Sequence, residues 1–348
     1  MQLVFDKAEL LSEHEYAAPH VVLGQKIHGG FDAAGNYISP RTKIRSQAVA
    51  NWTKALRDRG GNLLDADSSL LSGPRMPNVN QQRLLIRNGL GNIFWNVLTI
   101  TGKIEARGKF LATTSFPNLQ DVIEEDISEM AIGHLNKGLL IAHGIDEGGI
   151  PEEGIGGHDV MWFIARDLVF GKNAYNDVEP PGSISREEAG QRNMPELSLP
   201  IEMFLSFLMN LLLIEFRAEI GFAAAQQVMR TEGLFEVPTE HSELAAEIIE
   251  RIRTDEKIHV ESLCLYLGEI RSIHLKSESW GLVSGKDLID RFWNNLIRWA
   301  TVDQPKLVAQ ASYEPIRDRI LKTGTSGEEL LKQFNQLSDT DFQVAAGG

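Results

Sequence analysis

Apolar residues recur at intervals of three and four over long stretches of this 348-residue chain, and strand-like alternation is scarce. Because this spacing places apolar side chains on one face of an α-helix, the pattern predicts an all-α protein. Proline, glycine and polar residues separate the periodic segments. The expected helices cover residues 40–60, 81–112, 119–146, 157–170, 200–230, 241–275, 285–301 and 312–336.

The periodic segments follow one another without an internal repeat or a clear boundary, so we expect a single helical domain over residues 1–348. The chain is long enough to bury a sizeable core. Residues 171–199 contain three prolines and many polar residues without a clear period. A loop of that length in a compact domain is usually a lid, a binding loop or an insertion.

The composition excludes several classes of protein. The formal net charge is −14 and there is no basic tract, so we expect no nucleic-acid partner. The apolar run at 204–214 is shorter than the about twenty residues that cross a bilayer, which predicts a buried central helix and no membrane association. The N-terminal segment has no secretory pattern, and the single Cys264 cannot form an internal disulfide, so we expect a cytoplasmic protein.

An acid–histidine pair in the segment RTDEKIHVESLCLYLGEI is the clearest candidate for chemistry. Glu256 and His259 are three residues apart and share a helix face that continues through Leu263 and Ile270. We therefore expect the pair on an apolar face of the helix. Asp255 precedes His259 by four residues and could join it.

Two glutamates in the apolar helix form a second candidate. Glu215 and Glu219 are four residues apart, on a row that continues to Leu208 and Phe222. Carboxylates on such a row are costly to bury unless they are paired with cations, protonated or bound to a metal. Arg217 points to a different face, so the alternative to a metal is an ion pair with a neighbouring helix.

Three further residues are expected on buried faces. His134 shares its face with several isoleucines, and a lone histidine there can also be a hydrogen-bonded core residue. Glu105 follows apolar residues on one row, although Lys109 offers it an ordinary surface ion pair. His158 shares its face with Trp162 and could bind a metal, hydrogen-bond a ligand or cap its helix.

This arrangement resembles the ferritin-like di-metal carboxylate superfamily. Its members supply one Glu from each of two bundle helices and a Glu-x-x-His pair from each of the other two. The resemblance implies a ferritin-like four-helix core over about residues 90–275, with flanking helices at 40–60 and 285–336. The implied metal ligands, in helix order, are Glu105, His134, Glu219 or Glu215, and Glu256 with His259.

The resemblance also implies a function, that of a non-haem iron or manganese oxidoreductase or oxygenase. Carboxylate and imidazole ligands suit one or two ions of Fe or Mn, and open coordination positions would let O₂ or peroxide bind. The substrate would be an unidentified, fairly hydrophobic organic molecule. The sequence leaves a homo-oligomer open.

One position departs from the superfamily pattern. Ala131 stands where a Glu is expected three residues before His134. Glu129 or His158 would have to supply the missing ligand, or the site would hold one ion or none. Two alternatives therefore stay open. One is a non-catalytic helical protein that binds a ligand or partner, and the other is the related haem-oxygenase-like scaffold, with Asp255 and His259 as ligands.

Overall fold

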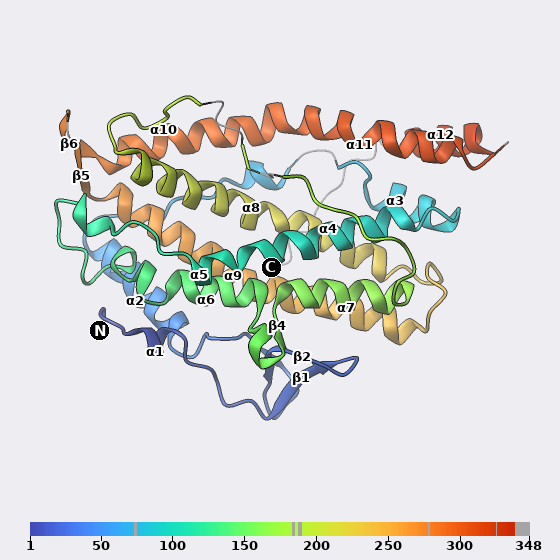
Figure 1. The fold of residues 1–348 in the computed structure, drawn as a ribbon, viewed down its shortest axis with the longest axis horizontal. Coiled ribbons are helices and arrows are strands. Elements are labelled where there is room, and N and C mark those ends of the chain that lie inside the picture. Colours follow the sequence, from blue (N-terminus) through green and yellow to red (C-terminus); the bar gives the residue numbers. More distant parts are fainter. Residues whose placement is uncertain (73–74, 183–184, 187–189, 278, 325, 338–348) are drawn as a thin grey trace.

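Helices predominate in the computed structural model, which describes residues 1–72, 75–182, 185–186, 190–277, 279–324 and 326–337. The helices in the middle of the molecule are α4 (Asn92–Gly108), α6 (Leu139–Gly148), α7 (His158–Phe170), α8 (Leu199–Met229) and α9 (Thr239–Arg271) (Figure 1). α8 packs along α9, α7 lies against both α4 and α9, and α6 contacts α4 and α7.

The long helices α8 and α9 form where the sequence is most regular. Pro200 lies in the first turn of α8, where its missing N–H costs no hydrogen bond. α8 buries residues on most of its sides, because helices pack around it. α9 has one mainly buried half from Ser262 to Ile270 and a more polar start. Both segments therefore match the helices expected at 200–230 and 241–275.

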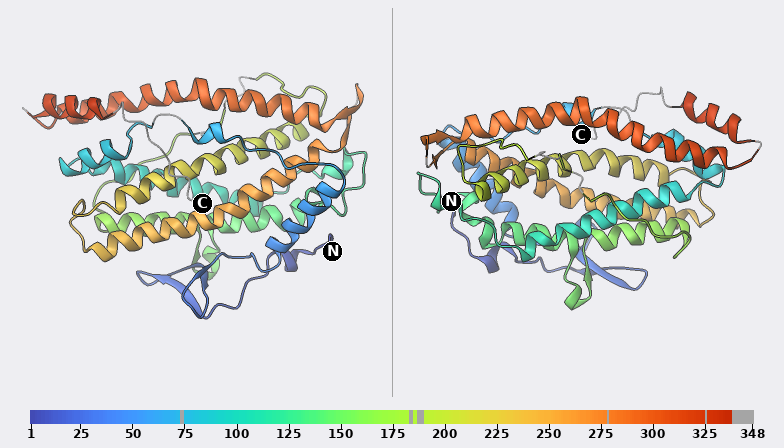
Figure 2. Two further views of the ribbon diagram at one scale, coloured as in Figure 1. Left: turned by 180° about the vertical axis from the view of Figure 1, so that it is seen from behind. Right: turned by 45° about the horizontal axis from the view of Figure 1, so that its top comes forward.

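Shorter helices surround this group. α10 (Gly285–Arg298) packs on α8 and α9 and continues through a π-helical turn at Trp299–Asp303 into α11 (Gln304–Leu321). Together they form a long rod along one side of the molecule (Figure 2). The other peripheral helices are α1 (Lys7–Leu10), α2 (Arg45–Asp58), α3 (Val79–Arg87), α5 (Phe110–Thr113) and α12 (Gly327–Gln336).

Short strands correct the expectation of an all-α protein. β1 (Ala18–Val22), β2 (Gln25–Phe31) and β3 (Tyr37–Ile38) form an antiparallel sheet, and β4 (Ile155–Gly156) pairs in parallel with β2. A separate hairpin joins β5 (His274–Ser277) to β6 (Gly281–Ser284). The strands have two to seven residues, too few to give a periodic signal that competes with the helical one. The protein is mostly helical.

The helix expected at 119–146 was largely wrong. In the structure an α-helix begins only at Leu139, and the preceding segment holds 3₁₀ turns at Leu119–Asp121 and Ala131–Lys137. Ile123 forms a β-bridge with Leu275. Ile123 and Ile127 are therefore buried although the segment that contains them is irregular. The helix expected at 81–112 is divided after α3, because Gly89 has a φ of 77°.

Among the described residues, α8 is the one helix that is long and apolar enough to cross a membrane. Its most apolar window of 18 residues is 56% buried inside the structure. The core helix of a soluble protein has the same length and composition, so a single helix of this kind is weak evidence for a membrane span.

Candidate metal centre

Four glutamates and three histidines meet where α4, α6, α7, α8 and α9 approach one another. All of these side chains are buried except that of Glu105, which is half-buried. They fall into two overlapping groups. Within each group, the potential ligand atoms lie within 4.8 Å of one another. The seven residues are Glu105 on α4, His143 and Glu147 on α6, His158 on α7, Glu215 on α8, and Glu256 and His259 on α9.

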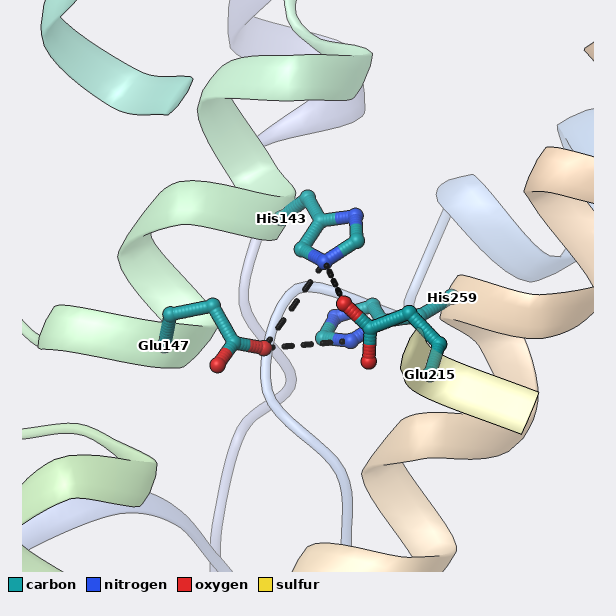
Figure 3. A group of neighbouring side chains, drawn as sticks. All are labelled: His143, Glu147, Glu215 and His259. Carbon is teal, nitrogen blue, oxygen red and sulfur yellow. Dashed lines mark hydrogen bonds and ion pairs between the residues drawn. The ribbon is translucent and has the colours of Figure 1, made fainter. Parts of the chain in front are cut away.

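The first group joins α6, α8 and α9 (Figure 3). His143 Nε2 lies 3.0 Å from Glu215 Oε1, and His259 Nδ1 lies 3.3 Å from Glu147 Oε1. The imidazole rings of His143 and His259 are stacked, with their centroids 3.8 Å apart. The four side chains therefore turn nitrogen and oxygen atoms toward a common point.

The second group, of Glu105, Glu147, His158 and Glu256, shares a carboxylate with the first. His158 Nδ1 lies 3.3 Å from Glu147 Oε1 and 3.1 Å from Glu256 Oε1. The other oxygen of Glu256, Oε2, lies 2.9 Å from His259 Nδ1. Glu147 and Glu256 thus stand between His158 and His259, in the position of ligands that could bridge two ions.

Three facing atoms in this cluster have no hydrogen-bond partner among the described residues. They are Glu147 Oε1, His158 Nδ1 and Glu256 Oε1. Buried polar atoms are rarely left unsatisfied, since each costs about 1–3 kcal/mol. When all four glutamates are ionised they carry a charge of −4, which two divalent cations would balance with +4. The donor atoms and the charge therefore fit a two-metal centre.

The electrostatics of the cluster show an excess of negative charge. Burial and the neighbouring carboxylates of Glu147 and Glu256 raise the pKa of Glu105 and that of Glu215 well above the usual range. Burial alone would lower the pKa of His259, but Glu256 and Asp146 raise it to about 9. Raised pKa values of both carboxyl groups and a histidine are expected where several negative charges are forced together.

Two aspartates hold the outer nitrogens of the facing histidines. His259 Nε2 lies 3.0 Å from Asp146 Oδ2, and His158 Nε2 lies 3.3 Å from Asp255 Oδ2. Each aspartate precedes a cluster glutamate in the sequence, and each holds the histidine of the opposite helix. When Nε2 donates to the aspartate, Nδ1 is left free to bind an ion.

The N-terminal segment supports both aspartates. Arg41 Nε donates to Asp146 Oδ1 at 2.8 Å, and Arg45 Nη2 donates to Oδ2 at 2.6 Å. Burial alone would raise the pKa of Asp146, but the two arginines hold it well below its ordinary value. At Asp255, His28 Nε2 lies 3.2 Å from Oδ2 and Tyr37 donates its hydroxyl at 2.8 Å.

A chain excursion separates Glu147, near the end of α6, from His158, at the start of α7. The two helices follow one another in line, and the excursion hangs below them with β4 (Figure 1). Backbone closes its neck, since a Cβ on Gly157 would lie 2.4 Å from Gly149 N and 2.6 Å from Glu147 O. Glu147 and His158 thus form a Glu-and-His pair like that of Glu256 and His259, although ten residues intervene.

The structure brings together many of the residues predicted from the sequence. Glu105, Glu215, Glu256 and His259 lie in the cluster. His158 also belongs to it, and Asp255 lies beside it as the hydrogen-bond partner of His158.

Three other candidates lie outside these groups of side chains. Glu219 forms an ion pair with Arg253 toward the outside of the bundle. His134 lies on a 3₁₀ turn, where its Nε2 accepts a hydrogen bond from Phe5 N at 3.2 Å. Glu129, which was considered as a replacement for the missing glutamate, is exposed.

The sequence analysis missed His143 and Glu147. The periodicity over 119–146 predicts one continuous helix, whereas α6 begins only at Leu139. The Asp-Glu dipeptide is the signal that could have found the site, since Asp146-Glu147 repeats Asp255-Glu256. Ala131 lies on the 3₁₀ turn at Ala131–Lys137, while Glu147 belongs to both groups.

Two of the cavities in the structure reach this cluster. One, of about 520 Å³, is lined by α8 and α9 and includes Glu215 and Glu256. Another, of about 370 Å³, lies between α4 and α8 and includes Glu105. Small molecules can therefore approach the cluster although its side chains are largely buried.

No family model, curated protein or solved structure matches this chain. Its buried groups of histidine, glutamate and aspartate could hold metal ions. The interpretation of the cluster accordingly rests on its own geometry and chemistry.

Proposed function

We propose that this protein is a two-metal oxidoreductase of the ferritin-like type, which binds iron or manganese and acts on an organic substrate. The observation that carries the proposal is that Glu147 and Glu256 each lie within 3.3 Å of both His158 and His259. Two carboxylates shared in this way between two imidazoles are suited to bridge a pair of ions.

The proposed ligand set follows the superfamily pattern through an interrupted helix. Glu105 comes from the first helix, the pair Glu147 and His158 from the second, Glu215 from the third, and Glu256 with His259 from the fourth. In this proposal α6 and α7 together form one helix of a four-helix bundle with α4, α8 and α9. His143 adds a seventh donor on the side of Glu215.

Oxygen and imidazole donors of this kind suit Fe and Mn, and such ions would supply redox chemistry with O₂ or peroxide. The residues of the chain would position the ions and limit access of water. Asp146 and Asp255 would orient His259 and His158, while the apolar side chains of Trp162 and Phe222 line the approach from the side of Glu105. A cytoplasmic location belongs to the same proposal, because Cys264 is a free, buried thiol.

Metal analysis of the purified protein tests the proposal. We expect about two Fe or Mn ions per chain in the wild-type protein, measured by inductively coupled plasma mass spectrometry. Glu147→Ala and Glu256→Ala should lose both ions, because each removes a shared carboxylate. Glu219→Ala is the matched control, since Glu219 lies on α8 one turn from Glu215 and pairs with Arg253. Equal metal content in all four proteins would refute the proposal.

Oxygen uptake separates an oxidoreductase from a non-catalytic binding protein. The protein loaded with Fe(II) should consume O₂ faster than free Fe(II) at the same concentration, and Glu256→Ala should not. A protein that holds two ions but leaves the rate of O₂ uptake unchanged would support the non-catalytic alternative. The haem-oxygenase-like alternative predicts instead that Asp255→Ala, and not Glu256→Ala, removes the metal.

A further inference from the structure

The cavity beside Glu105 contains an unusual pair of cations. It has a volume of about 370 Å³ and lies between α4, α8 and the turn that joins α10 to α11. Arg75 and Arg217 both line it. The guanidinium of Arg75 packs beside Gly221, one helical turn after Arg217, because a Cβ on Gly221 would lie 3.5 Å from Arg75 Nη1.

Neither arginine has a carboxylate partner within ion-pair distance in the described part of the chain. Arg217 donates to the side-chain oxygen of Gln304, which is neutral. Burial lowers the pKa of both guanidinium groups, and the proximity of Arg217 adds to the effect on Arg75. Two like charges that line one cavity, with their guanidinium groups largely buried, are costly unless an anion balances them.

The rest of this cavity is mostly apolar. Its wall toward the cluster combines Ile104 and Trp162 with Glu105, and Trp299 covers it from the side of α11. The neighbouring cavity of about 520 Å³ is different, because its five glutamates outnumber its two cations, Arg253 and Lys257. The cavity beside Glu105 therefore combines two positive charges with an apolar surface next to the cluster.

We propose that this cavity binds the substrate, and that the substrate is an organic acid with an apolar body. Arg75 and Arg217 would hold its carboxylate through charged hydrogen bonds. The apolar part would extend along Ile104 and Trp162 toward Glu105. The identification of this ligand as the substrate rests on the proposed function, while the anion site itself rests on the cavity and its two arginines.

Calorimetric titration with octanoate tests the inference on the metal-loaded protein. Octanoate should bind more tightly than 1-octanol or octylammonium, which have the same chain length but lack the negative charge. Arg75→Gln and Arg217→Gln should each weaken octanoate binding by about tenfold or more. Arg217→Lys keeps the charge and should retain part of the affinity. Arg87→Gln, on the exposed surface of α3, is the matched control and should bind as the wild type does.

Metal content and circular dichroism of the same variants serve as the check on folding, and both should equal those of the wild-type protein. Equal binding of octanoate and octanol, or unchanged binding in both glutamine variants, would overturn the anion site. A protein that binds two ions but no octanoate refutes this inference and leaves the proposed function intact. A protein that binds octanoate but takes up neither Fe nor Mn supports the anion site and refutes the proposed function.

Discussion

His158 Nδ1 lies 3.3 Å from Glu147 Oε1, although the two residues are eleven positions apart in the sequence. In α9 the equivalent pair, Glu256 and His259, is separated by a single helical turn. The difference is the excursion between α6 and α7, whose two ends meet backbone to backbone at Gly149 and Gly157. Glu147 and His158 are therefore distant in the sequence, while their side chains meet as those of Glu256 and His259 do.

Gly157→Ala should damage this neck. The added Cβ would lie 2.6 Å from Glu147 O and 2.7 Å from Asp146 O, so the start of α7 would have to move away from α6. We expect a loss of roughly 1–3 kcal/mol in the free energy of unfolding, and fewer than two ions per chain. Gly182→Ala is the control, because nothing lies within 4 Å of a Cβ at that position. Wild-type metal content in Gly157→Ala would argue against the paired role of Glu147 and His158.

Asp255→Asn and Asp146→Asn should distinguish two effects. One is the effect of histidine orientation on metal binding, and the other is the effect of a buried ion pair on the free energy of unfolding. Asp255→Asn is expected to weaken metal binding about tenfold to a hundredfold, because it alters the partner of His158 Nε2. Asp146→Asn should also destabilise the fold by about 3–5 kcal/mol, since Arg41 and Arg45 lose a buried counter-charge. Chelator competition and urea unfolding measure the two quantities. Asp290→Asn, in a partly exposed ion pair with Arg271, should change neither by a comparable amount.

Glu269 should make the stability of the metal-free protein depend on pH. Burial raises the pKa of this carboxyl from 4.5 to about 7, although Ile132 N donates to it at 3.0 Å. The folded state therefore holds a proton that the unfolded state releases, and stability falls as the pH rises from about 4.5 to about 7. Glu269→Gln cannot ionise and should escape a loss of up to about 3 kcal/mol. Urea unfolding at pH 5 and pH 8, with chelator present, measures this difference. An equal change in the free energy of unfolding in the wild type and in Glu269→Gln would contradict the explanation.

His134→Ala should reduce stability without affecting metal content. The ring of His134 is buried 4.9 Å from that of Trp52, and its Nε2 accepts a hydrogen bond from Phe5 N. We expect a loss of about 2–3 kcal/mol in the free energy of unfolding, from the cavity and the unsatisfied N–H. The variant should still bind as many ions as the wild-type protein. A loss of metal at a temperature where it remains folded would mean that His134 acts on the cluster after all.

The sequence predicted those parts of the site that a single regular helix presents. Glu256 and His259 share one face of α9, and periodicity alone places them on its buried side. Glu215 and Glu105 followed from the same reasoning on α8 and α4. The same reasoning did not predict the position of Glu219. α8 is apolar on most of its sides, so its sequence does not reveal which sides face other helices.

Periodicity failed where apolar residues are buried without a helix. His134 is buried as predicted, but a 3₁₀ turn turns it toward Phe5 and Trp52 instead of the cluster. Glu147 could not be paired with His158 from spacing, because the excursion that separates them closes only through tertiary contacts. Periodicity did not predict the N-terminal strands for a similar reason. They are short, and they are stabilised by pairing with one another and with β4.

The hydrogen bonds around the cluster join segments that are remote in the sequence. Arg41 and Asp146 are 105 positions apart, Asp146 and His259 are 113 apart, and Tyr37 and Asp255 are 218 apart. During synthesis, Tyr37 and His28 can therefore meet Asp255 only after this part of α9 has left the ribosome. Metal capture would be a late event in the maturation of this protein, and a chain truncated before His259 should leave the ribosome unable to retain the ions.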